Sequence, residues 1–487
     1  VLTRQMESTS RSRPLHAPEP PARKGHIVAI VPRGEVLRNF EYSGTFDQIA
    51  SESELTLLSV APNERVVAEL QKKYGEIYPL TEVRESWPVR FQRELLDISH
   101  GRVLWSKAAQ ERWRIRDAEA KTLGRKAVRT TKKALAAPFA TRSGVRALNR
   151  IERASSRWLN SDRSYTDLYE RIRPTLVFNG SHIHSRNAIQ AVQAAQWLGI
   201  PTATFIFSWD NLTSQGRITL PYDYLLVWND HIREQLLEMY PAIRPENVFV
   251  TGTPQFDHHF QTENYLSREE FCGSVGADPS RPIVLYSTGM ANHMPDEPWI
   301  VESIADMLLE HPDTERPQLL VRVYAKDRTG RFEVLKRRRP DILFQKVEWD
   351  EDWHTPRPED AVGLTNALRH CSVGINIASP ISLELFMFDK PVINVAYDPP
   401  SGNSLGLQNA RFYEFEHYKP LVDSGAVELA RTADEMKALT AQCLQDPSRR
   451  SLNRGAFLRK MFADTLDGAS ATRVSRALIK VASPAAI

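Results

Sequence analysis

The stretch 373–398, VGINIASPISLELFMFDKPVINVAYD, contains two apolar runs separated by a short amphipathic one. The runs VGINIA and PVINVA are rich in Val and Ile, which favour strands, and ISLELFMF between them has the character of a helix. A strand, a helix and a second strand in this order form a βαβ unit, in which the two strands are parallel. The stretch therefore predicts an α/β protein with a parallel sheet.

The same alternation extends outward from this unit. IVLYS (283–287) and LLVRVY (319–324) predict strands before it, while HIVAIV (26–31) and LTLLSV (55–60) begin a separate series near the N-terminus. Because a polar stretch around residue 260 divides the two series, we expect two doubly wound sheets in tandem. Ligands of such sheets bind beyond the carboxyl ends of the strands, so two facing sheets predict a binding cleft between them.

The predicted domain boundaries follow from these two series. Residues 1–24 are rich in Ser, Arg and Pro and are expected to form a disordered tail. One Rossmann-like domain is expected over 25–260 and a second over 261–487. Residues 63–170 interrupt the first series without a convincing strand pattern and predict a helical insertion. The segment 427–483 is predicted to be helical, with a last helix able to cross back onto the first domain.

The charge of the chain is unevenly distributed. The net charge is +3, but residues 101–160 carry 16 Lys and Arg against 4 Asp and Glu, a balance of +12 that leaves −9 for the remainder. Such a basic surface indicates an anionic partner, namely phosphates, an anionic membrane face or nucleic acid. A solvated helical face is the alternative. Nucleic acid is the least favoured partner, because few aromatic residues are interleaved with the charges.

The composition restricts the class of protein. With 41% hydrophobic and 25% charged residues, the chain has the composition of a globular protein. No apolar run approaches the roughly 20 residues that cross a bilayer. The three cysteines, Cys272, Cys371 and Cys443, are far apart and match neither a metal site nor a disulfide framework. We therefore expect a cytoplasmic protein, with residues 101–160 available for peripheral contact with the inner face of the membrane.

Small hydroxyl residues follow the strand 373–378, directly before the predicted helix. Ser379 and Ser382 lie at the helix start, where free N–H groups and the positive end of the helix dipole favour an anion such as pyrophosphate. Glu384 lies in the first turn, where its carboxylate is suited to accept the two hydroxyls of a ribose. The alternative is a helix cap, with Glu384 complementing the dipole.

This pattern resembles the donor domain of GT-B glycosyltransferases, in which a small-hydroxyl turn, a helix with SLEL and a KPVI strand follow one another. The stretch ENVFVTGTPQFD (246–257) resembles the interdomain segment of the same superfamily, which includes sugar-nucleotide 2-epimerases and glycerophosphate transferases. The resemblance implies that Glu384 binds the nucleotide ribose and that Ser379 and Ser382 contact its phosphates. It covers roughly 27–440 without the insertion, and it selects a superfamily rather than a substrate.

Two further segments complete the predicted donor site. Ser287, Thr288 and Gly289 end the first strand of the second sheet, so their polar groups are expected to face the cleft. Arg322 lies near a strand end, where the superfamily often places a basic residue for the phosphates; an ordinary ion pair is the alternative, and Lys326 competes for the role. The predicted donor-binding residues are Gly252, Thr253, Ser287, Thr288, Gly289, Arg322, Ser379, Ser382 and Glu384.

Two loops of the first domain, FNGSHIHSRNA (178–188) and FSWDNLTSQG (207–216), begin where strands are predicted to end. An imidazole with a pKa of about 6.5 is suited to take a proton from an acceptor hydroxyl, and a carboxylate would orient it. We predict His182 as this base, Asp210 as its partner and His184 as a further catalytic candidate; a surface or capping histidine is the alternative. The predicted acceptor-binding residues are Asn179, Ser181, Trp209 and Asn211.

No metal or resident cofactor is predicted. Asp257, His258 and His259 are adjacent, so their side chains point different ways on regular structure, and no further ligand is evident nearby. The sequence contains neither a phosphate loop of the type GxxxxGK[ST] nor a GxGxxG motif. An NTPase or a dehydrogenase is therefore disfavoured.

These features predict a metal-independent glycosyltransferase that moves a sugar from a nucleoside-diphosphate donor to an acceptor hydroxyl, in polysaccharide or glycoconjugate synthesis. The basic segment favours an anionic or lipid-linked acceptor. A sugar-nucleotide 2-epimerase is the closest alternative, followed by a glycerophosphate-type transferase. A non-catalytic protein that binds nucleotide sugars or nucleic acid is the alternative of another class, and turnover of a donor distinguishes it.

Overall fold

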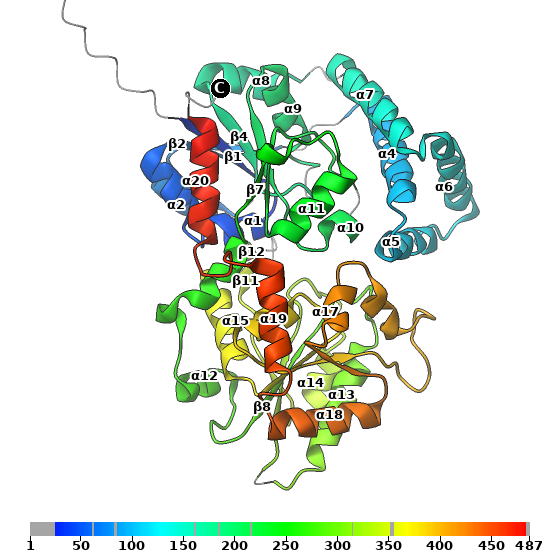
Figure 1. Cartoon of the computed structure of the whole chain (residues 1–487), viewed down its shortest axis with the longest axis vertical. Helices are drawn as coiled ribbons and strands as arrows, with labels where there is room; N and C mark the ends of the chain where they lie inside the picture. Colours follow the sequence, from blue (N-terminus) through cyan, green and yellow to red (C-terminus); the bar gives the residue numbers. More distant parts are fainter. Residues whose placement is uncertain are drawn as a thin grey trace, which may run out of the picture.

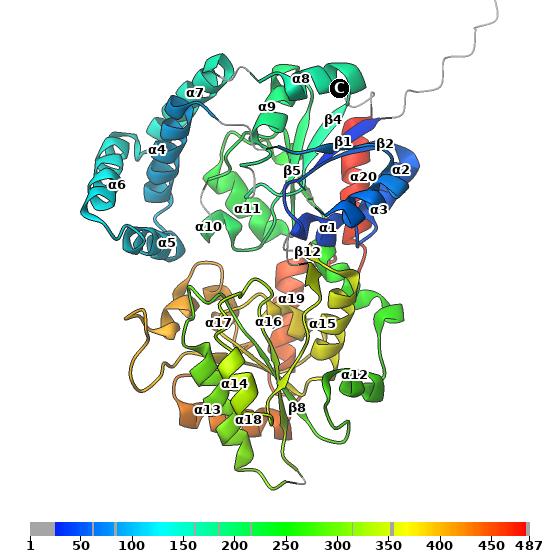
Figure 2. The same cartoon turned by 180° about the vertical axis from the view of Figure 1, so that it is seen from behind.

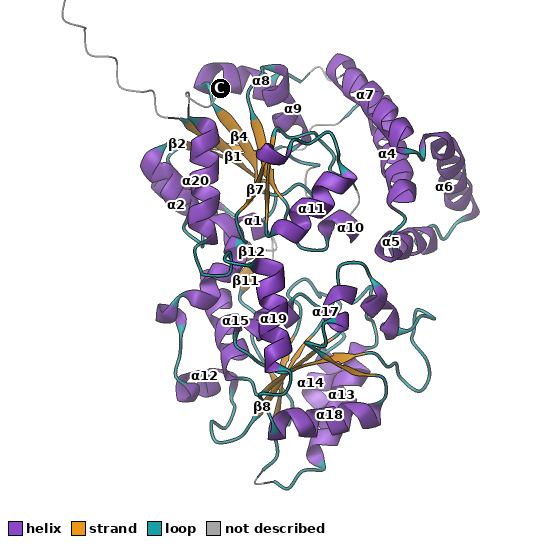
Figure 3. Ribbon diagram, viewed as in Figure 1, coloured by secondary structure: helices purple, strands orange, loops and turns teal. Residues whose placement is uncertain are grey.

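Two parallel sheets, each packed between helices, form the protein (Figures 1 and 3). The computed structural model describes residues 25–60, 63–81, 85–159, 162–183, 186–214, 217–313, 315–350 and 355–483. The predicted α/β class with two Rossmann-like sheets is confirmed. The tail 1–24 lies outside the described residues.

The first sheet has seven parallel strands in the order β3-β2-β1-β4-β5-β6-β7. The order reverses direction between β1 and β4, so the loops at their carboxyl ends flank the switch point where such sheets bind ligands. The strands are β1 (His26–Val31), β2 (Glu54–Ser59), β3 (Ile77–Pro79), β4 (Leu176–Asn179), β5 (Thr202–Phe205), β6 (Tyr224–Val227) and β7 (Val248–Val250). Its helices include α1 (Glu35–Phe40), α2 (Thr45–Glu52), α3 (Glu64–Tyr74), α8 (Ser164–Ile172), α9 (Ile189–Trp197), α10 (Asn211–Ser214) and α11 (Asp230–Met239).

The second sheet repeats this order with six strands, β10-β9-β8-β13-β14-β15, and has its switch point between β8 and β13. The stretch that predicted the fold forms β13 (Val373–Asn376), α16 (Ile381–Met387) and β14 (Val392–Val395). The other strands are β8 (Ile283–Ser287), β9 (Gln318–Arg322), β10 (Leu343–Phe344) and β15 (Glu428–Ala430), and a separate ribbon pairs β11 (Trp349–Asp350) with β12 (Thr355–Pro356). The helices are α12 (Arg268–Val275), α13 (Glu297–Leu309), α14 (Glu333–Arg338), α15 (Pro358–His370), α17 (Lys419–Asp423), α18 (Ala433–Gln445) and α19 (Ser451–Phe462).

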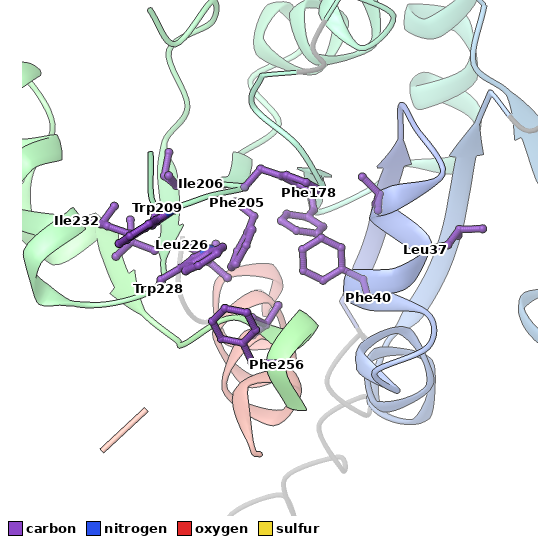
Figure 4. Packing of buried hydrophobic residues seen from close by; sticks show 14 of the residues in the cluster. Leu37, Phe40, Phe178, Phe205, Ile206, Trp209, Leu226, Trp228, Ile232 and Phe256 are labelled. Carbon is purple, nitrogen blue, oxygen red and sulfur yellow. The ribbon is translucent and has the colours of Figure 1, made fainter. Parts of the chain in front are cut away.

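Aromatic side chains fix α1 on the first sheet. The Phe40 ring lies edge-on to Phe178 of β4 and Phe205 of β5, at centroid distances of 5.3 and 5.4 Å (Figure 4). Phe256, in the interdomain segment, packs edge-on against Trp228 at 5.4 Å. These buried contacts hold α1, and with it the loop that follows β1, at the domain interface.

The helical insertion is shorter than predicted. Four helices, α4 (Trp87–Leu104), α5 (Lys107–Ala118), α6 (Leu123–Ala136) and α7 (Arg142–Leu159), project beside the first sheet (Figures 1 and 2). By contrast, β3 pairs with β2, and α8 packs against α9, so both belong to the sheet layers. The sequence pattern missed β3 because three partly exposed residues, IYP, give no periodicity.

The C-terminal segment departs from its predicted all-helical character, since β15 completes the edge of the second sheet. The last helix, α20 (Ser470–Ala482), crosses back and packs against α2, β1 and β4 (Figure 1). The Asp257 carboxylate accepts the N–H groups of Ser470 and Ala471, at 3.2 and 2.8 Å, and so caps the start of this helix. The end of the predicted second domain therefore belongs structurally to the first.

The carboxyl ends of the two sheets meet at the domain interface. A Cβ on Gly34, in the loop after β1, would lie 1.9 Å from Oγ1 of Thr355 in β12, so only glycine permits this approach. Lys326, which follows β9, forms an ion pair with Glu35 at the start of α1. Both switch points thus border the same interface.

Two observations concern the chain as a whole. Among the described residues, no helix is both long and apolar enough to cross a membrane. Cys272, Cys371 and Cys443 are buried free thiols. Burial raises the pKa of the Cys371 thiol to about 12, so it remains protonated at neutral pH.

Candidate active site

Three cationic side chains gather where the loop after β1 meets the loop after β9. Arg33 Nε lies 3.4 Å from the Glu35 carboxylate, and Lys326 pairs with the same carboxylate from the other domain. Arg38, one turn along α1, donates to Gln255 Oε1 over 2.9 Å. Burial lowers the pKa of Lys326, Glu35 opposes this, and Arg33 and Arg38 add to the lowering. Arg33 and Lys326 therefore share one carboxylate, and Arg38 is close enough to act on the charge of Lys326, so positive charge is in excess at the interface.

Glu35 is the only carboxylate among the residues named in this cluster, and it is almost completely buried. Burial has the largest effect on its pKa and raises it, but Lys326 and Arg33 oppose burial strongly enough that the net pKa is lowered. The carboxylate is consequently ionised at neutral pH. Its Oε2 atom makes no hydrogen bond among the described residues and is held only by the ion pair with Arg33 Nε at 3.4 Å.

Arg322 is turned away from this cluster and into its own domain. Its Nη2 donates to both carboxylate oxygens of Asp360 at 2.8 Å, and Nη1 donates to Gln345 Oε1 over 3.1 Å. The Arg322 and Asp360 side chains are only 10% and 8% exposed. The ion pair considered as the alternative for Arg322 is therefore the arrangement in the structure.

The Ser382 hydroxyl is fully buried within the second domain. It accepts from Asn376 Nδ2 over 3.1 Å and lies 2.9 Å from the Tyr418 hydroxyl. Tyr418 in turn donates to Asn394 Oδ1 over 3.0 Å. These bonds close a polar network beneath the start of α16, so Ser382 supports the turn and its hydroxyl does not project into the interface.

Ser287, which ends β8, and the two residues that follow it differ in their bonding. Gly289 N donates to the Glu297 carboxylate over 2.9 Å, and Thr288 Oγ1 accepts from Tyr324 N over 2.8 Å. Burial raises the pKa of Glu297 to about 7, against the opposing effect of a neighbouring arginine. The Ser287 hydroxyl, in contrast, has no hydrogen-bond partner among the described residues. It is the side chain of this turn whose buried hydroxyl is left unpaired among the described residues.

Glu384 bridges to the interdomain segment. Its Oε2 lies 2.8 Å from His259 Nε2, and His259 Nδ1 lies 2.9 Å from Thr365 Oγ1. The Glu384 side chain is 15% exposed. Ser379 is half-buried, and its hydroxyl accepts from Ile381 N over 3.4 Å, a long contact of the capping type. Both residues thus lie at the predicted turn, with polar atoms that are only partly engaged.

Gly252 and Thr253 lie in the segment that connects the domains. Gly252 has a φ of 76°, and a Cβ there would lie 2.4 Å from Ser470 Oγ. The position therefore requires glycine for the close packing of α20. Thr253 is buried, and its Oγ1 has no hydrogen-bond partner among the described residues. Packing accounts for Gly252, whereas no contact of the Thr253 hydroxyl within the described residues accounts for Thr253.

His182 is a buried residue beside the carboxyl end of β5. Its Nδ1 lies 3.1 Å from the Phe205 carbonyl oxygen. Burial lowers its pKa to about 4, opposed by that contact and by the charge of Asp210. His182 is therefore neutral at pH 7. The other proposed catalytic histidine, His184, lies outside the described residues.

A second imidazole, which the sequence analysis did not identify, approaches from the other domain. His417 lies beside Trp209, with ring centroids 5.8 Å apart. Its Nδ1 is buried without a hydrogen-bond partner among the described residues. Burial lowers its pKa, and Asp210 opposes the lowering, as it does for His182. His417 follows an irregular segment, so no strand-end pattern marked it in the sequence.

The predicted acceptor-binding residues fall into two groups. Asn179 Nδ2 donates to the Tyr222 hydroxyl over 2.8 Å, and Asn179 Oδ1 accepts from Ser181 N over 3.3 Å, so these residues brace the loop after β4. Asn211 lies beside Asp210, to which its Nδ2 donates over 3.3 Å, and its buried Oδ1 has no partner among the described residues. Asn211 therefore contacts the candidate catalytic carboxylate.

The adjacent residues considered for a metal site have separate partners. Asp257 caps α20, and His258 Nδ1 lies 3.4 Å from Gln261 Oε1. His259 binds Glu384, as described above. Within the described ranges, no group of three or more His, Cys, Asp or Glu side chains is arranged to hold a metal ion.

A cavity of about 720 Å³ opens at the carboxyl ends of β14 and β15. Trp299 and Tyr397 line it, with ring centroids 6.4 Å apart and nearly perpendicular planes. Asp398, Glu414 and Arg431 contribute charged groups. The cavity lies to one side of the β8–β13 switch point and does not coincide with the predicted donor residues.

Comparison with known proteins identifies the fold. No protein-family model matches the sequence, and a search of characterised proteins gives no match. The solved structure of S. aureus MnaA with UDP has a TM-score of 0.51 at 12% identity and covers 92% of this chain and 94% of that one. The UDP-GlcNAc 2-epimerase of Neisseria meningitidis bound to UDP-GlcNAc has a TM-score of 0.50 at 11% identity, with coverages of 94% and 100%. That of Methanocaldococcus jannaschii gives 0.50 and 11%, with coverages of 92% and 99%. The chain therefore has the GT-B fold, as the resemblance of its sequence implied.

Proposed function

We propose that the protein is a nucleotide-sugar enzyme that transfers a glycosyl group from a nucleoside-diphosphate donor to an acceptor hydroxyl. The observation that carries the proposal is the cluster of Arg33, Arg38 and Lys326 between the two switch points. A departing diphosphate develops negative charge as the glycosidic bond breaks, and preorganised cations stabilise that charge in the transition state. These side chains supply the stabilisation without a metal ion.

The second domain is proposed to hold the nucleotide. Ser287 and Ser379 lie at the two loops of the β8–β13 switch point, and both are proposed to contact phosphate oxygens. Glu384 is proposed to bind the ribose, exchanging its contact with His259 for the sugar hydroxyls. Solved structures of the same fold contain UDP or UDP-GlcNAc, which supports a uridine nucleotide as the donor.

The acceptor hydroxyl is proposed to lose its proton to His182. The imidazole is neutral at pH 7, and Asp210 stabilises the charged form that results. His417 borders the same carboxylate from the other domain and would complete this site when the domains are together. Trp209, which contacts His417, is proposed to pack against the acceptor.

A 2-epimerase is the second candidate. It is favoured by the solved structures with similar folds, which include 2-epimerases with TM-scores of 0.50 to 0.52. An epimerase needs only one bound sugar nucleotide, whereas a transferase also needs an acceptor. Without an acceptor, an epimerase therefore still converts the sugar nucleotide, whereas a transferase does not transfer its sugar.

The test is a thermal-shift screen with UDP, GDP, CDP and dTDP, followed by NMR of the corresponding sugar nucleotides incubated with the protein. Transfer predicts stabilisation by one diphosphate and release of that diphosphate only with an acceptor. Inversion at the sugar C2 without an acceptor would establish the epimerase instead.

Arg38→Gln serves as the test variant because Arg38 belongs to the cationic cluster. Arg65→Gln is the matched control, since Arg65 is an exposed arginine on α3 whose Nε lies 3.6 Å from Glu69. We expect Arg38→Gln, and not Arg65→Gln, to lose the diphosphate-induced shift. Absence of a shift with every diphosphate in the unmodified protein would contradict the proposal.

A further inference from the structure

Helix α7 carries a continuous stripe of arginines on its outer face. Their spacing of four, four, three and four residues follows the helical repeat, so the side chains share one side of the helix over about 22 Å. All are exposed, and none forms an ion pair with a carboxylate among the described residues. The stripe consists of Arg142, Arg146, Arg150, Arg153 and Arg157.

The opposite face of α7 fixes the direction in which the stripe points. Leu148 packs in a small apolar core with residues of α4 and α6. Glu152, the only acidic residue of the helix, is buried and bonded to Arg93 of α4 over 2.6 Å. Ser156 donates to Gln193 of α9 over 3.0 Å. Because these contacts hold the inner face against α4 and α9, the arginines are held facing outward.

Helix α6 is equally basic, but several of its cations form ion pairs. Arg129 and Lys133 both pair with Asp117, and Lys132 pairs with Glu94. Much of the positive charge of α6 is thus neutralised within the insertion. Among the described residues, all five cations of α7 thus lack an ion pair, whereas three of the five cations of α6 have one.

Apolar side chains lie along one flank of the stripe. Ile151 is 51% exposed and Trp158 is 86% exposed, and they are seven residues apart on the helix. Leu159 adds a further exposed apolar side chain at the end. A helix with arginines on one side and aliphatic and tryptophan side chains beside them is suited to lie in a membrane interface, where tryptophan is favoured at the headgroup level.

We propose that the outer face of α7 docks on a bilayer containing anionic lipids. The arginines would contact lipid phosphates, and Ile151 and Trp158 would enter the boundary between headgroups and acyl chains. A nucleic acid would satisfy the charges but would not require the aliphatic flank, so the observations favour the bilayer. The proposal concerns a surface separate from the donor site and does not depend on the transfer chemistry.

The test is sedimentation of the whole protein with vesicles of phosphatidylcholine alone and of phosphatidylcholine with 30% phosphatidylglycerol, at about 0.1 M and 0.5 M salt. We expect binding only to the anionic vesicles and weakening with salt. The stripe variant replaces Arg146, Arg150, Arg153 and Arg157 with glutamine. Since each cation contributes several-fold to binding at an anionic surface, its affinity is expected to fall roughly 100-fold or more.

The control variant removes the same charge from exposed positions elsewhere, by changing Arg65, Lys72, Arg244 and Arg337 to glutamine. It is expected to bind within about threefold of the unmodified protein, because its stripe is intact. Trp158→Ser tests the apolar flank and is expected to weaken binding even at low salt. Equal loss in both quadruple variants, equal binding to neutral vesicles, or binding to soluble RNA without binding to vesicles would overturn the proposal. Unchanged diphosphate binding in the stripe variant would show that the donor site is intact.

Discussion

The two sheets have the same strand order, and each has loops at its switch point: the loop after β1 in the first sheet, and the loops after β8 and β9 in the second. The polar groups of these loops nevertheless have different partners. In the second sheet, Arg322 and Gly289 are bonded to carboxylates of their own domain. In the first, Arg33 and Arg38 face the partner domain, from which Lys326 approaches. Topology therefore determines where a ligand would lie, whereas the local partners determine which side chains are available to it.

The contrast is sharpest between Arg322 and Lys326, which are four residues apart. The arginine is directed inward to Asp360, and the lysine crosses to Glu35. A basic residue near a strand end is thus an ambiguous signal until its partner is known. The following predictions distinguish a structural ion pair within one domain from a cation that binds the ligand.

Arg322→Met is expected to have the largest effect, on stability and not on nucleotide binding. It leaves the Asp360 carboxylate buried without its cation, which costs about 3–5 kcal/mol. Urea unfolding measures the loss, and titration with the diphosphate identified by the screen measures binding. The double variant with Asp360→Leu should recover part of the stability. A selective loss of affinity with normal stability would place Arg322 in the donor site instead.

His182→Gln tests burial in the first domain. The pKa of His182 is about 4 in the folded protein, below the ordinary value near 6.5, so its neutral form stabilises the fold above pH 6.5. That contribution, about 3 kcal/mol, is lost as the pH falls from 6.5 through 4. Unfolding free energies of the two proteins at pH 7.5 and pH 4 should show a smaller pH dependence in the variant. An identical dependence would mean that His182 is solvated.

The strands show what the sequence could and could not predict. Buried strands such as β1 and β8 were located to the residue, because continuous apolar runs leave few alternatives. The short edge strands β3 and β15 were missed, since three residues carry little periodicity. Glu384 and Ser287 were placed at the correct edge of the sheet by the same reasoning.

The partners of these side chains were beyond the reach of sequence patterns. Glu384 bonds to His259, 125 residues away, and Lys326 bonds to Glu35, 291 residues away. Arg33 and Arg38 follow the first strand, so a search for cations after every strand, and not only in the second sheet, would have found them. His417 follows no strand and carried no such signal.

Arg38→Gln and Lys326→Met test the cations at the interface, in contrast to the inward-facing Arg322. Each removes one cation from the cluster, and we expect roughly 10- to 100-fold weaker diphosphate binding, because a charged hydrogen bond contributes about 1.5–3 kcal/mol. Arg38→Gln should leave unfolding nearly unchanged, since its guanidinium bonds to neutral groups. Calorimetric titration with the diphosphate measures the effect. Unchanged affinity in both variants would remove the cluster from the proposed site.

Glu416→Gln is expected to have the smallest effect. The Glu416 carboxylate, in the second domain, accepts the N–H groups of Lys107 and Ala108 at 2.6 and 3.3 Å and so caps α5 of the insertion. Because glutamine keeps an acceptor but loses the charge that complements the helix dipole, the cost should be about 0.5–1 kcal/mol. Faster hydrogen exchange at the first amides of α5, with unchanged global unfolding, is the expected result. A cost as large as that of Arg322→Met would instead make this contact a main link between the insertion and the second domain.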